Sequence, residues 1–295
     1  MSMPARLIAA TVALCAFTLA TAQQPVTMQS RDAPQGTPVV LDGHWFPAAM
    51  AAANTRAAPA VVLLHGCGGM FNRQGALADR YTRMAAFFNQ RGVHALVLDS
   101  LRPRGERELC TQKVGERRIT MVQRRRDVFG ALGWLAAQPG VDSSRLGLLG
   151  WSNGGSTVLA SINLKHREVA AAGVAPAFTV AFAVAYYPGC EADLARGFTP
   201  SAPLLMLLGE ADDWTLAAPC KALAAAADTA TAAAPQWQAY EGAYHGFDGT
   251  EPLRLRRDVP GGANPGQGVH VGANPAAREA SWQRLAEFLQ SKGIP

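Results

Sequence analysis

The chain has 295 residues, of which 49% are hydrophobic and 17% are charged. This length can bury a sizeable core, and the composition excludes a disordered, a collagen-like or a small disulfide-stapled protein. The formal net charge of +5 arises from 27 basic and 22 acidic residues spread along the chain, so we expect no nucleic-acid partner.

The densest basic cluster lies at the start of a predicted helix over residues 118–138 and includes the residue before it. It consists of Arg117, Arg118, Arg124, Arg125 and Arg126. No aromatic residues alternate with these arginines, and an acidic residue follows them directly, which is unlike a phosphate-binding stripe. We therefore expect a solvent-exposed helix face here.

Residues 1–22 have the pattern of a secretory signal peptide. One early positive charge, Arg6, precedes an uncharged apolar stretch over residues 7–20, and small residues at 20–22 form an A-x-A cleavage site. The stretch of about fourteen residues is too short to span a bilayer. We expect cleavage after Ala22, a periplasmic or secreted protein, and no stable membrane insertion.

Cysteine usage agrees with an oxidising compartment. Cleavage would remove Cys15 and leave Cys67, Cys110, Cys190 and Cys220. An even number of cysteines outside the cytoplasm indicates disulfides, and four cysteines allow three pairings. No C-x-x-C pair occurs, so we expect neither a zinc site nor a redox motif, and no metal.

Short apolar runs alternate with longer helix-like segments along the rest of the chain. In chain order, they predict a strand at 60–64, a helix at 76–90, a strand at 93–98, a helix at 118–138, a strand at 146–149, a helix at 154–164, strands at 180–187 and 204–208, a helix at 217–229, a strand at 237–240 and a helix at 276–290. Continuously apolar strands are typical of a parallel sheet covered on both faces. The sequence predicts one doubly wound α/β domain over residues 23–295.

The segment Gly150-Trp151-Ser152-Asn153-Gly154 has the pattern G-x-S-x-G and lies between a predicted strand and a predicted helix. Flanking glycines allow a tight turn in which any Cβ would collide with neighbouring backbone. Such a turn raises the serine hydroxyl above the sheet, beside the amides of a helix N-terminus. This position favours a nucleophile elbow with Ser152 as nucleophile over an ordinary glycine-rich turn.

A nucleophile elbow imposes a chain order in which the acid comes next and the histidine last. Among the histidines that follow the plausible acids, His245 is preferred over His270 because it lies only a few residues past the last predicted strand. For the acid, the spacing after the strand at 204–208 favours Asp212 over Asp213. The carboxylate would accept the imidazole Nδ1–H and fix the tautomer of the ring.

Acyl transfer also needs hydrogen-bond donors for the oxyanion that forms. The backbone N–H of Asn153, directly after the nucleophile, is one such donor. The second is expected from the loop at 65–69, where we choose the N–H of Cys67, with Gly68 as the alternative. A catalytic thiol at Cys67 is less favoured because no strand-to-helix turn positions it.

Five segments taken together resemble the dienelactone hydrolase family of α/β-hydrolases. They are Leu63-Leu64-His65-Gly66-Cys67-Gly68-Gly69, Asp99-Ser100 with Pro103-Arg104-Gly105, Gly150-Trp151-Ser152-Asn153-Gly154-Gly155, Gly209-Glu210-Ala211-Asp212-Asp213-Trp214-Thr215 and Tyr244-His245-Gly246-Phe247. The resemblance implies an α/β-hydrolase fold, ester or lactone hydrolysis without a cofactor, and a triad of Ser152, Asp212 and His245. The namesake enzymes carry a cysteine nucleophile, so the serine here is similar to the esterase members and leaves the substrate open.

The loop from Asp99 to Cys110 and the positions of the motifs suggest two further hypotheses. Arg102 and Arg104, with Arg107 nearby, are candidates for bidentate binding of a carboxylate or phosphate on the substrate; a solvated loop is the alternative. From the positions of the motifs, we also hypothesise that Cys67 pairs with Cys110 beside the oxyanion loop. Cys190 would then pair with Cys220 at the carboxyl end of the sheet.

The combined prediction is a secreted or periplasmic serine hydrolase that cleaves small carboxylic esters or lactones through an acyl-enzyme intermediate. A serine peptidase, or a polyester or feruloyl esterase, on the same fold is the alternative among enzymes. A binding protein that kept the fold without the chemistry is the alternative from another class.

Overall fold

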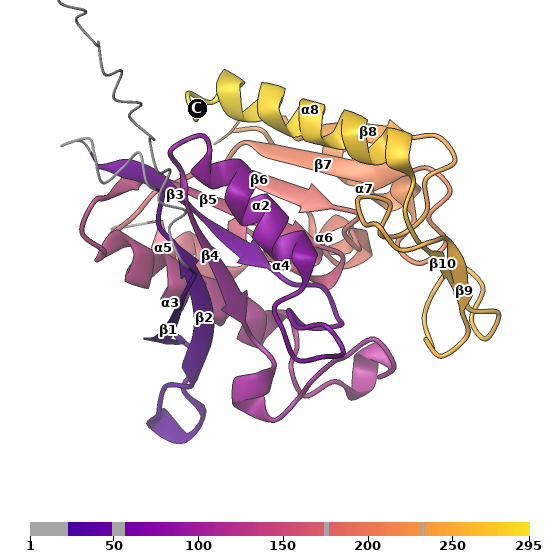
Figure 1. The fold of residues 1–295 in the computed structure, drawn as a ribbon, viewed down its shortest axis with the longest axis horizontal. Coiled ribbons are helices and arrows are strands. Elements are labelled where there is room, and N and C mark those ends of the chain that lie inside the picture. Colours follow the sequence, from indigo (N-terminus) through magenta and orange to yellow (C-terminus); the bar gives the residue numbers. More distant parts are fainter. Residues whose placement is uncertain (1–22, 49–56, 174–176, 231, 233) are drawn as a thin grey trace, which may run out of the picture.

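The computed structural model describes residues 23–48, 57–173, 177–230, 232 and 234–295. The predicted signal peptide at 1–22 lies outside these residues. Within them, eight strands form one sheet in the order β1-β2-β4-β3-β5-β6-β7-β8 (Figure 1). The strands are β1 Gln24–Gln29, β2 Val40–Phe46, β3 Ala58–Leu64, β4 His94–Asp99, β5 Val141–Trp151, β6 Val180–Tyr186, β7 Leu204–Gly209 and β8 Gln236–Tyr240.

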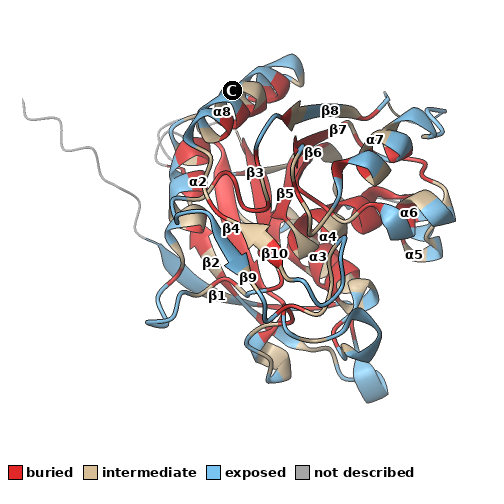
Figure 2. Ribbon diagram, turned by 90° about the vertical axis from the view of Figure 1, so that its right-hand side faces the viewer, coloured by how far each residue is buried: buried red, intermediate tan, exposed pale blue. Residues whose placement is uncertain are grey.

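The strands from β4 to β8 in this order run parallel, whereas β2 pairs antiparallel with both β1 and β4. Helices cover both faces of the sheet, with α2 and α8 on one side and α3, α4 and α7 on the other (Figure 2). The helices are α2 Asp79–Asn89, α3 Met121–Ala136, α4 Asn153–Ile162, α5 Arg167–Ala172, α6 Glu191–Arg196, α7 Ala217–Ala225 and α8 Pro275–Ser291. The predicted fold class, a doubly wound α/β-hydrolase fold, is confirmed.

Continuously apolar strands supply both hydrophobic cores at once. Along β3, Val62 and Leu64 pack into the cluster under α3 and α4, whereas Val61 and Leu63 pack into the cluster under α2 and α8. Successive side chains of a strand point to opposite faces, so an unbroken apolar run can fill both layers. The carboxyl ends of the central strands then present their loops at one edge, where ligand sites of parallel sheets lie.

The sequence analysis did not predict the elements at the margins of the fold. Strand β1 is the outermost strand and has most of its residues exposed, and in β2 beside it buried residues mostly alternate with exposed or half-buried ones. Both strands therefore lack the apolar runs that reveal the central strands. The glycine-rich region near the C-terminus contains a small antiparallel hairpin of β9 Arg254–Arg256 and β10 Val269–Val271.

Helix α3 corrects the expectation about the basic cluster. The helix begins at Met121 because Thr120 and Gln123 form a capping box. Arg124 and Arg125 are only 1% and 5% exposed, so the expected solvent-exposed face is wrong for these two residues. They turn inward because Arg124 donates to the Asn153 side chain and the His65 carbonyl, and Arg125 pairs with the half-buried Glu168.

Candidate active site

Ser152 occupies a sharp turn between β5 and α4. Its backbone angles, φ 54° and ψ −120°, lie outside the regions that residues other than glycine usually adopt. A Cβ on Gly150 would lie 2.2 Å from the carbonyl oxygen of Gly154, and one on Gly154 would lie 2.1 Å from that of Leu64. Only glycine fits at these two positions, so the G-x-S-x-G pattern is a steric requirement of this turn.

The structure brings Ser152, His245 and Asp212 together in a chain of hydrogen-bonding distances. Ser152 Oγ lies 2.9 Å from His245 Nε2, and His245 Nδ1 lies 2.8 Å from Asp212 Oδ2. The acid and the histidine are both buried, and the serine borders a cavity. This geometry can pass a proton from the serine hydroxyl to an imidazole that a carboxylate orients.

The Asp212 carboxylate is held by the loop that follows it. Its Oδ1 accepts hydrogen bonds from the backbone N–H groups of Trp214 at 2.8 Å and Thr215 at 2.9 Å. The Thr215 hydroxyl lies 3.1 Å from Asp212 Oδ2 and 3.1 Å from His245 Nδ1. These contacts leave Oδ2 facing the imidazole.

The alternative acid and histidine form a pair of their own. Asp213 Oδ2 lies 2.7 Å from His270 Nδ1, and Asp213 Oδ1 accepts the His270 backbone N–H at 2.8 Å. The Asp213 carbonyl accepts the N–H of Ala263 at 2.8 Å. Asp213 therefore ties the β9–β10 hairpin to the end of β7.

A buried hydrogen-bonded network around Asp248 includes Tyr187, whose ring packs against His245. Asp248 accepts hydrogen bonds from Trp151 Nε1 at 2.8 Å and from the Tyr187 hydroxyl at 2.6 Å, and Arg80 lies 3.2 Å from it. Burial raises the pKa of the Tyr187 hydroxyl well above its ordinary value, so it stays a neutral donor. The Tyr187 ring lies 4.6 Å from the His245 ring and limits where the imidazole can move.

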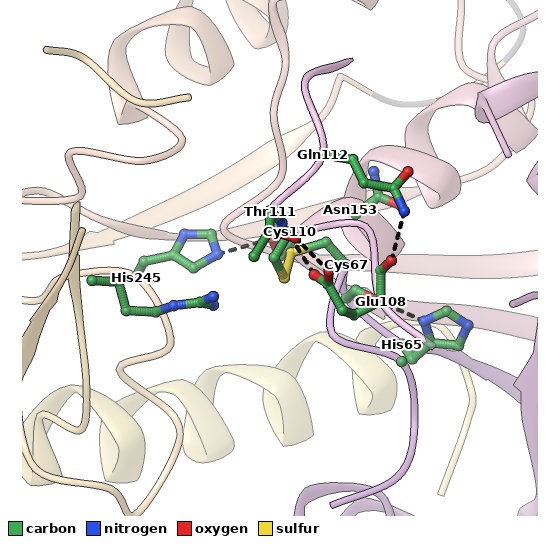
Figure 3. The surroundings of a disulfide bond; sticks show 12 residues. His65, Cys67, Glu108, Cys110, Thr111, Gln112, Asn153 and His245 are labelled. Carbon is green, nitrogen blue, oxygen red and sulfur yellow. Dashed lines mark hydrogen bonds between the residues drawn. A yellow bond between two sulfur atoms is a disulfide. The ribbon is translucent and has the colours of Figure 1, made fainter. Parts of the chain in front are cut away.

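The candidate oxyanion donors come from two loops at the same edge of the sheet. Asn153 opens helix α4, and Cys67 lies in the loop after β3. Cys67 is bonded to Cys110, and its carbonyl accepts the Leu109 N–H at 2.7 Å. Figure 3 shows this disulfide with Asn153 and His65 on one side of it and His245 on the other. Cys67 therefore carries no free thiol.

The second disulfide joins Cys190 to Cys220, so both hypothesised pairings are present in the structure. It connects the start of α6 to α7, near the carboxyl ends of β6 and β7. Both cysteines are fully buried and belong to the hydrophobic cluster under α4.

The arginines proposed for substrate binding lie elsewhere. Arg104 donates to Asp127 at 2.8 and 2.9 Å and to Asp32 at 2.9 Å, so its guanidinium already has carboxylate partners. Arg102 stacks on the ring of Phe71 at 3.4 Å and lines a separate cavity of about 400 Å³ beside β1 and β2. Neither arginine is among the residues that line the cavity at Ser152.

The cavity that Ser152 borders has a volume of about 650 Å³, within the range of small-molecule sites. Apolar side chains form much of its wall, among them Val114, Ile119, Met121, Val122 and Trp214. Charged and polar groups line it as well, including Arg117, Arg125, His166, Asp193 and Arg196. Gly261 and Gly262, between β9 and β10, also line the cavity.

Several residues around the site escaped the sequence analysis. Thr215 and Tyr187 belong to motifs whose backbone position was recognised, but nothing in the sequence indicates that their side chains meet His245. The sequence predicts a solvated helix face for Arg124, but in the structure its guanidinium contacts both candidate oxyanion loops. A charged residue at an otherwise inward-facing helix position was the signal that could have identified it.

In the part of the chain that the structure describes, no cluster of three or more His, Cys, Asp or Glu side chains is arranged to hold a metal ion. Among the same residues, no helix is both long and apolar enough to cross a membrane.

Comparison with known proteins gives a family and a set of similar folds. The model of the dienelactone hydrolase family matches residues 46–293. A putative dienelactone hydrolase from Klebsiella pneumoniae has a similar structure, with 16% identity over 91% of this chain and 99% of that one and a TM-score of 0.60. No curated protein matches the sequence.

Two further similar structures have described activities of their own. A dienelactone hydrolase-like promiscuous phosphotriesterase from metagenomic libraries is 21% identical over 92% of this chain and 98% of its own, with a TM-score of 0.59. Esterase 2 of Thermogutta terrifontis, phosphorylated by paraoxon, is 16% identical over 90% of this chain and 94% of its own, with a TM-score of 0.56. At these identities the similarity establishes the fold.

Proposed function

This chain belongs to the dienelactone hydrolase family, and from that premise we propose that it is a serine hydrolase that cleaves carboxylic esters or lactones through an acyl-enzyme intermediate. The observation that carries the proposal is the 2.9 Å distance between Ser152 Oγ and His245 Nε2, on a turn that only flanking glycines permit. Strain at this serine is typical of a nucleophile held for attack.

In the first half of the reaction, Ser152 Oγ attacks the ester carbonyl carbon while His245 Nε2 takes the hydroxyl proton. The carbonyl oxygen becomes an oxyanion, which the backbone N–H groups of Cys67 and Asn153 would bind. The oxyanion collapses, the bond to the alcohol oxygen breaks, and the imidazolium returns its proton to that oxygen. Asp212 stabilises the imidazolium throughout because it accepts the Nδ1–H.

In the second half, water replaces the alcohol. His245 removes a proton from the water as its oxygen attacks the acyl carbon, and the same two N–H groups bind the new oxyanion. Breakage of the bond to Ser152 Oγ releases the carboxylic acid, and His245 returns the proton to the serine. For a lactone, the alcohol formed in the first half stays attached to the acyl group, and this step releases a single hydroxy acid.

The test uses a fluorophosphonate probe and a panel of p-nitrophenyl esters, lactones and feruloyl esters. We expect Ser152→Ala to abolish probe labelling and ester turnover. The control Ser144→Ala, at an exposed serine of β5 whose hydroxyl donates to Asp142, should label like the parent. Labelling that persists in Ser152→Ala would disprove the assignment of the nucleophile.

We propose in addition that the protein acts outside the cytoplasm. Two disulfides join its four cysteines after residue 22, and disulfides persist in oxidising compartments. Expression of the full chain followed by N-terminal sequencing of the periplasmic fraction should give a mature protein that begins at Gln23. Retention of Met1 in a cytoplasmic product would contradict export.

A further inference from the structure

Arg124 is a buried cation between the two candidate oxyanion loops. Its side chain is only 1% exposed. Nη1 donates to the side-chain oxygen of Asn153, and Nη2 donates to the backbone carbonyl of His65 at 2.7 Å. One rigid guanidinium therefore connects the loop after β3 to the nucleophile elbow.

This cation has no ion-pair partner among the described carboxylates, whereas the next two arginines of α3 both do. Arg125 and Arg126 pair with Glu168 at 2.7 Å. Burial lowers the pKa of the Arg124 guanidinium to about 10, which leaves it charged at neutral pH. Burying a charge without a carboxylate partner is costly, so a structural ion pair does not account for this residue.

His65 links Arg124 to the peptide that carries the other candidate donor, the N–H of Cys67. The Ser100 backbone N–H donates to His65 Nε2 at 3.2 Å, so the ring proton is on Nδ1, which lies 2.7 Å from the carbonyl oxygen of Gly66. Burial, aided by the positive charge of Arg124, lowers the pKa of His65 to about 3. The ring is therefore neutral at neutral pH, and its Nδ1–H donates to Gly66.

The hydrogen bond to Gly66 fixes the direction of the Cys67 N–H. The carbonyl of Gly66 and the N–H of Cys67 belong to one planar trans peptide and point in opposite directions. On the other side of Cys67, the carbonyl is held by Leu109 and the sulfur by Cys110. The peptide that offers the N–H is thus held at both ends.

We propose that Arg124 is a positioning residue of the oxyanion hole, which sets the separation of the Cys67 and Asn153 donors by bridging His65 and the Asn153 side chain. The inference rests on the serine hydrolase function proposed above. Preorganised donors act through their fixed positions, so loss of the bridge should weaken binding of the oxyanion while substrate binding in the ground state changes little.

The experiment compares Arg124→Met with Arg126→Met, which removes the same charge two residues along the same helix. For p-nitrophenyl acetate we expect Arg124→Met to lower kcat about 10²-fold, as loss of an oxyanion donor does, with KM within about threefold. The inhibition constant of phenylboronic acid, whose serine adduct places a hydroxyl in the oxyanion hole, should rise in parallel with the loss of kcat. Arg126→Met should change neither.

Arg124→Lys separates charge from geometry. A lysine keeps the positive charge but cannot present the planar fork that reaches both loops, so we expect an intermediate loss of kcat. Full activity in Arg124→Lys together with a loss in Arg124→Met would overturn the bridging role and leave only an effect of charge.

Asn153→Ala keeps the test decisive if Arg124→Met does not fold. This change removes the side-chain oxygen that Arg124 binds, while the residue still has a backbone N–H to offer as a donor. We expect roughly a tenfold loss of kcat, from a charged hydrogen bond that positions the donor, and a matching rise in the boronate inhibition constant. Unchanged values in Asn153→Ala, or in a folded Arg124→Met, would overturn the proposal.

Failure of the proposed function gives a different result. If the unmodified protein neither hydrolyses esters nor reacts with the fluorophosphonate, the function itself is wrong. If the unmodified protein does both and the Arg124 variants match it, only the positioning role is wrong.

Discussion

Two aspartate–histidine pairs lie side by side in this protein, and their acids are neighbours in the sequence. Asp212 lies 2.8 Å from His245, and Asp213 lies 2.7 Å from His270. By distance alone the two pairs are equivalent. They differ in how far they are buried and in the partner of the second imidazole nitrogen, Nε2.

The first pair is buried and the second is partly exposed. The side chains of His245 and Asp212 are 5% and 0% exposed, whereas those of His270 and Asp213 are 42% and 26% exposed. Nε2 of His245 lies at hydrogen-bonding distance from the hydroxyl of Ser152. The second pair instead connects the β9–β10 hairpin to the end of β7. An aspartate–histidine pair gains a chemical role only where a nucleophile completes it in a site with little water.

Removal of each histidine gives the largest contrast between the pairs. His245→Ala removes the base that takes the Ser152 proton, so we expect kcat to fall about 10⁶-fold. His270→Ala should keep kcat within about threefold, since exposed pairs contribute little. Steady-state kinetics on p-nitrophenyl acetate checks both, and comparable losses in the two variants would erase the distinction.

Removal of each carboxylate charge gives the next contrast. Asp212→Asn leaves the shape intact but favours the wrong imidazole tautomer, so we expect a loss in kcat of about 10⁴-fold. Asp213→Asn makes the same chemical change one residue away and should leave kcat nearly unchanged. A large loss in Asp213→Asn with a small one in Asp212→Asn would exchange the roles of the two acids.

The sequence favours the residues of the first pair, but nothing in it indicates that Asp213 and His270 form a second one. Strand and helix patterns located β3 to β8, and chain order with spacing selected Ser152, Asp212 and His245. The contact of Asp213 with His270 joins residues 57 positions apart, and that of Arg124 with His65 spans 59. The periodicity of apolar residues indicates which residues face inward, but it does not indicate which loops come into contact. The sequence therefore predicts neither these contacts nor the antiparallel strands β1 and β2.

Thr215 gives a smaller effect that is confined to the first pair. Its hydroxyl lies 3.1 Å from both Asp212 Oδ2 and His245 Nδ1 and 2.9 Å from the carbonyl oxygen of Tyr187. Thr215→Val keeps the shape and removes this contact, and a hydrogen bond to a charged group corresponds to about a tenfold loss in kcat. Thr215→Ser, which keeps the hydroxyl, serves as the control and should retain most of the activity.

The smallest predicted effect concerns the second pair and the cavity. Asp213→Ala removes both side-chain contacts to His270 and loosens the hairpin that carries Gly261 and Gly262 into the wall of the cavity. Since the reacting groups stay in place, we expect KM for the ester to rise about threefold, from loss of roughly 0.7 kcal/mol of a partly exposed pair, with little change in kcat.

Limited proteolysis gives an independent measure of the same hairpin. Local opening exposes backbone to protease, so Asp213→Ala should be cut faster than the parent between β9 and β10. Glu210→Ala is the matched control, because it removes a partly exposed ion pair with Lys221 at the same strand end. Equal cleavage rates in all three proteins, with unchanged KM, would mean that the second pair contributes nothing to the cavity wall; faster cleavage in Asp213→Ala alone would make it a structural tie, distinct from the chemistry of the first pair.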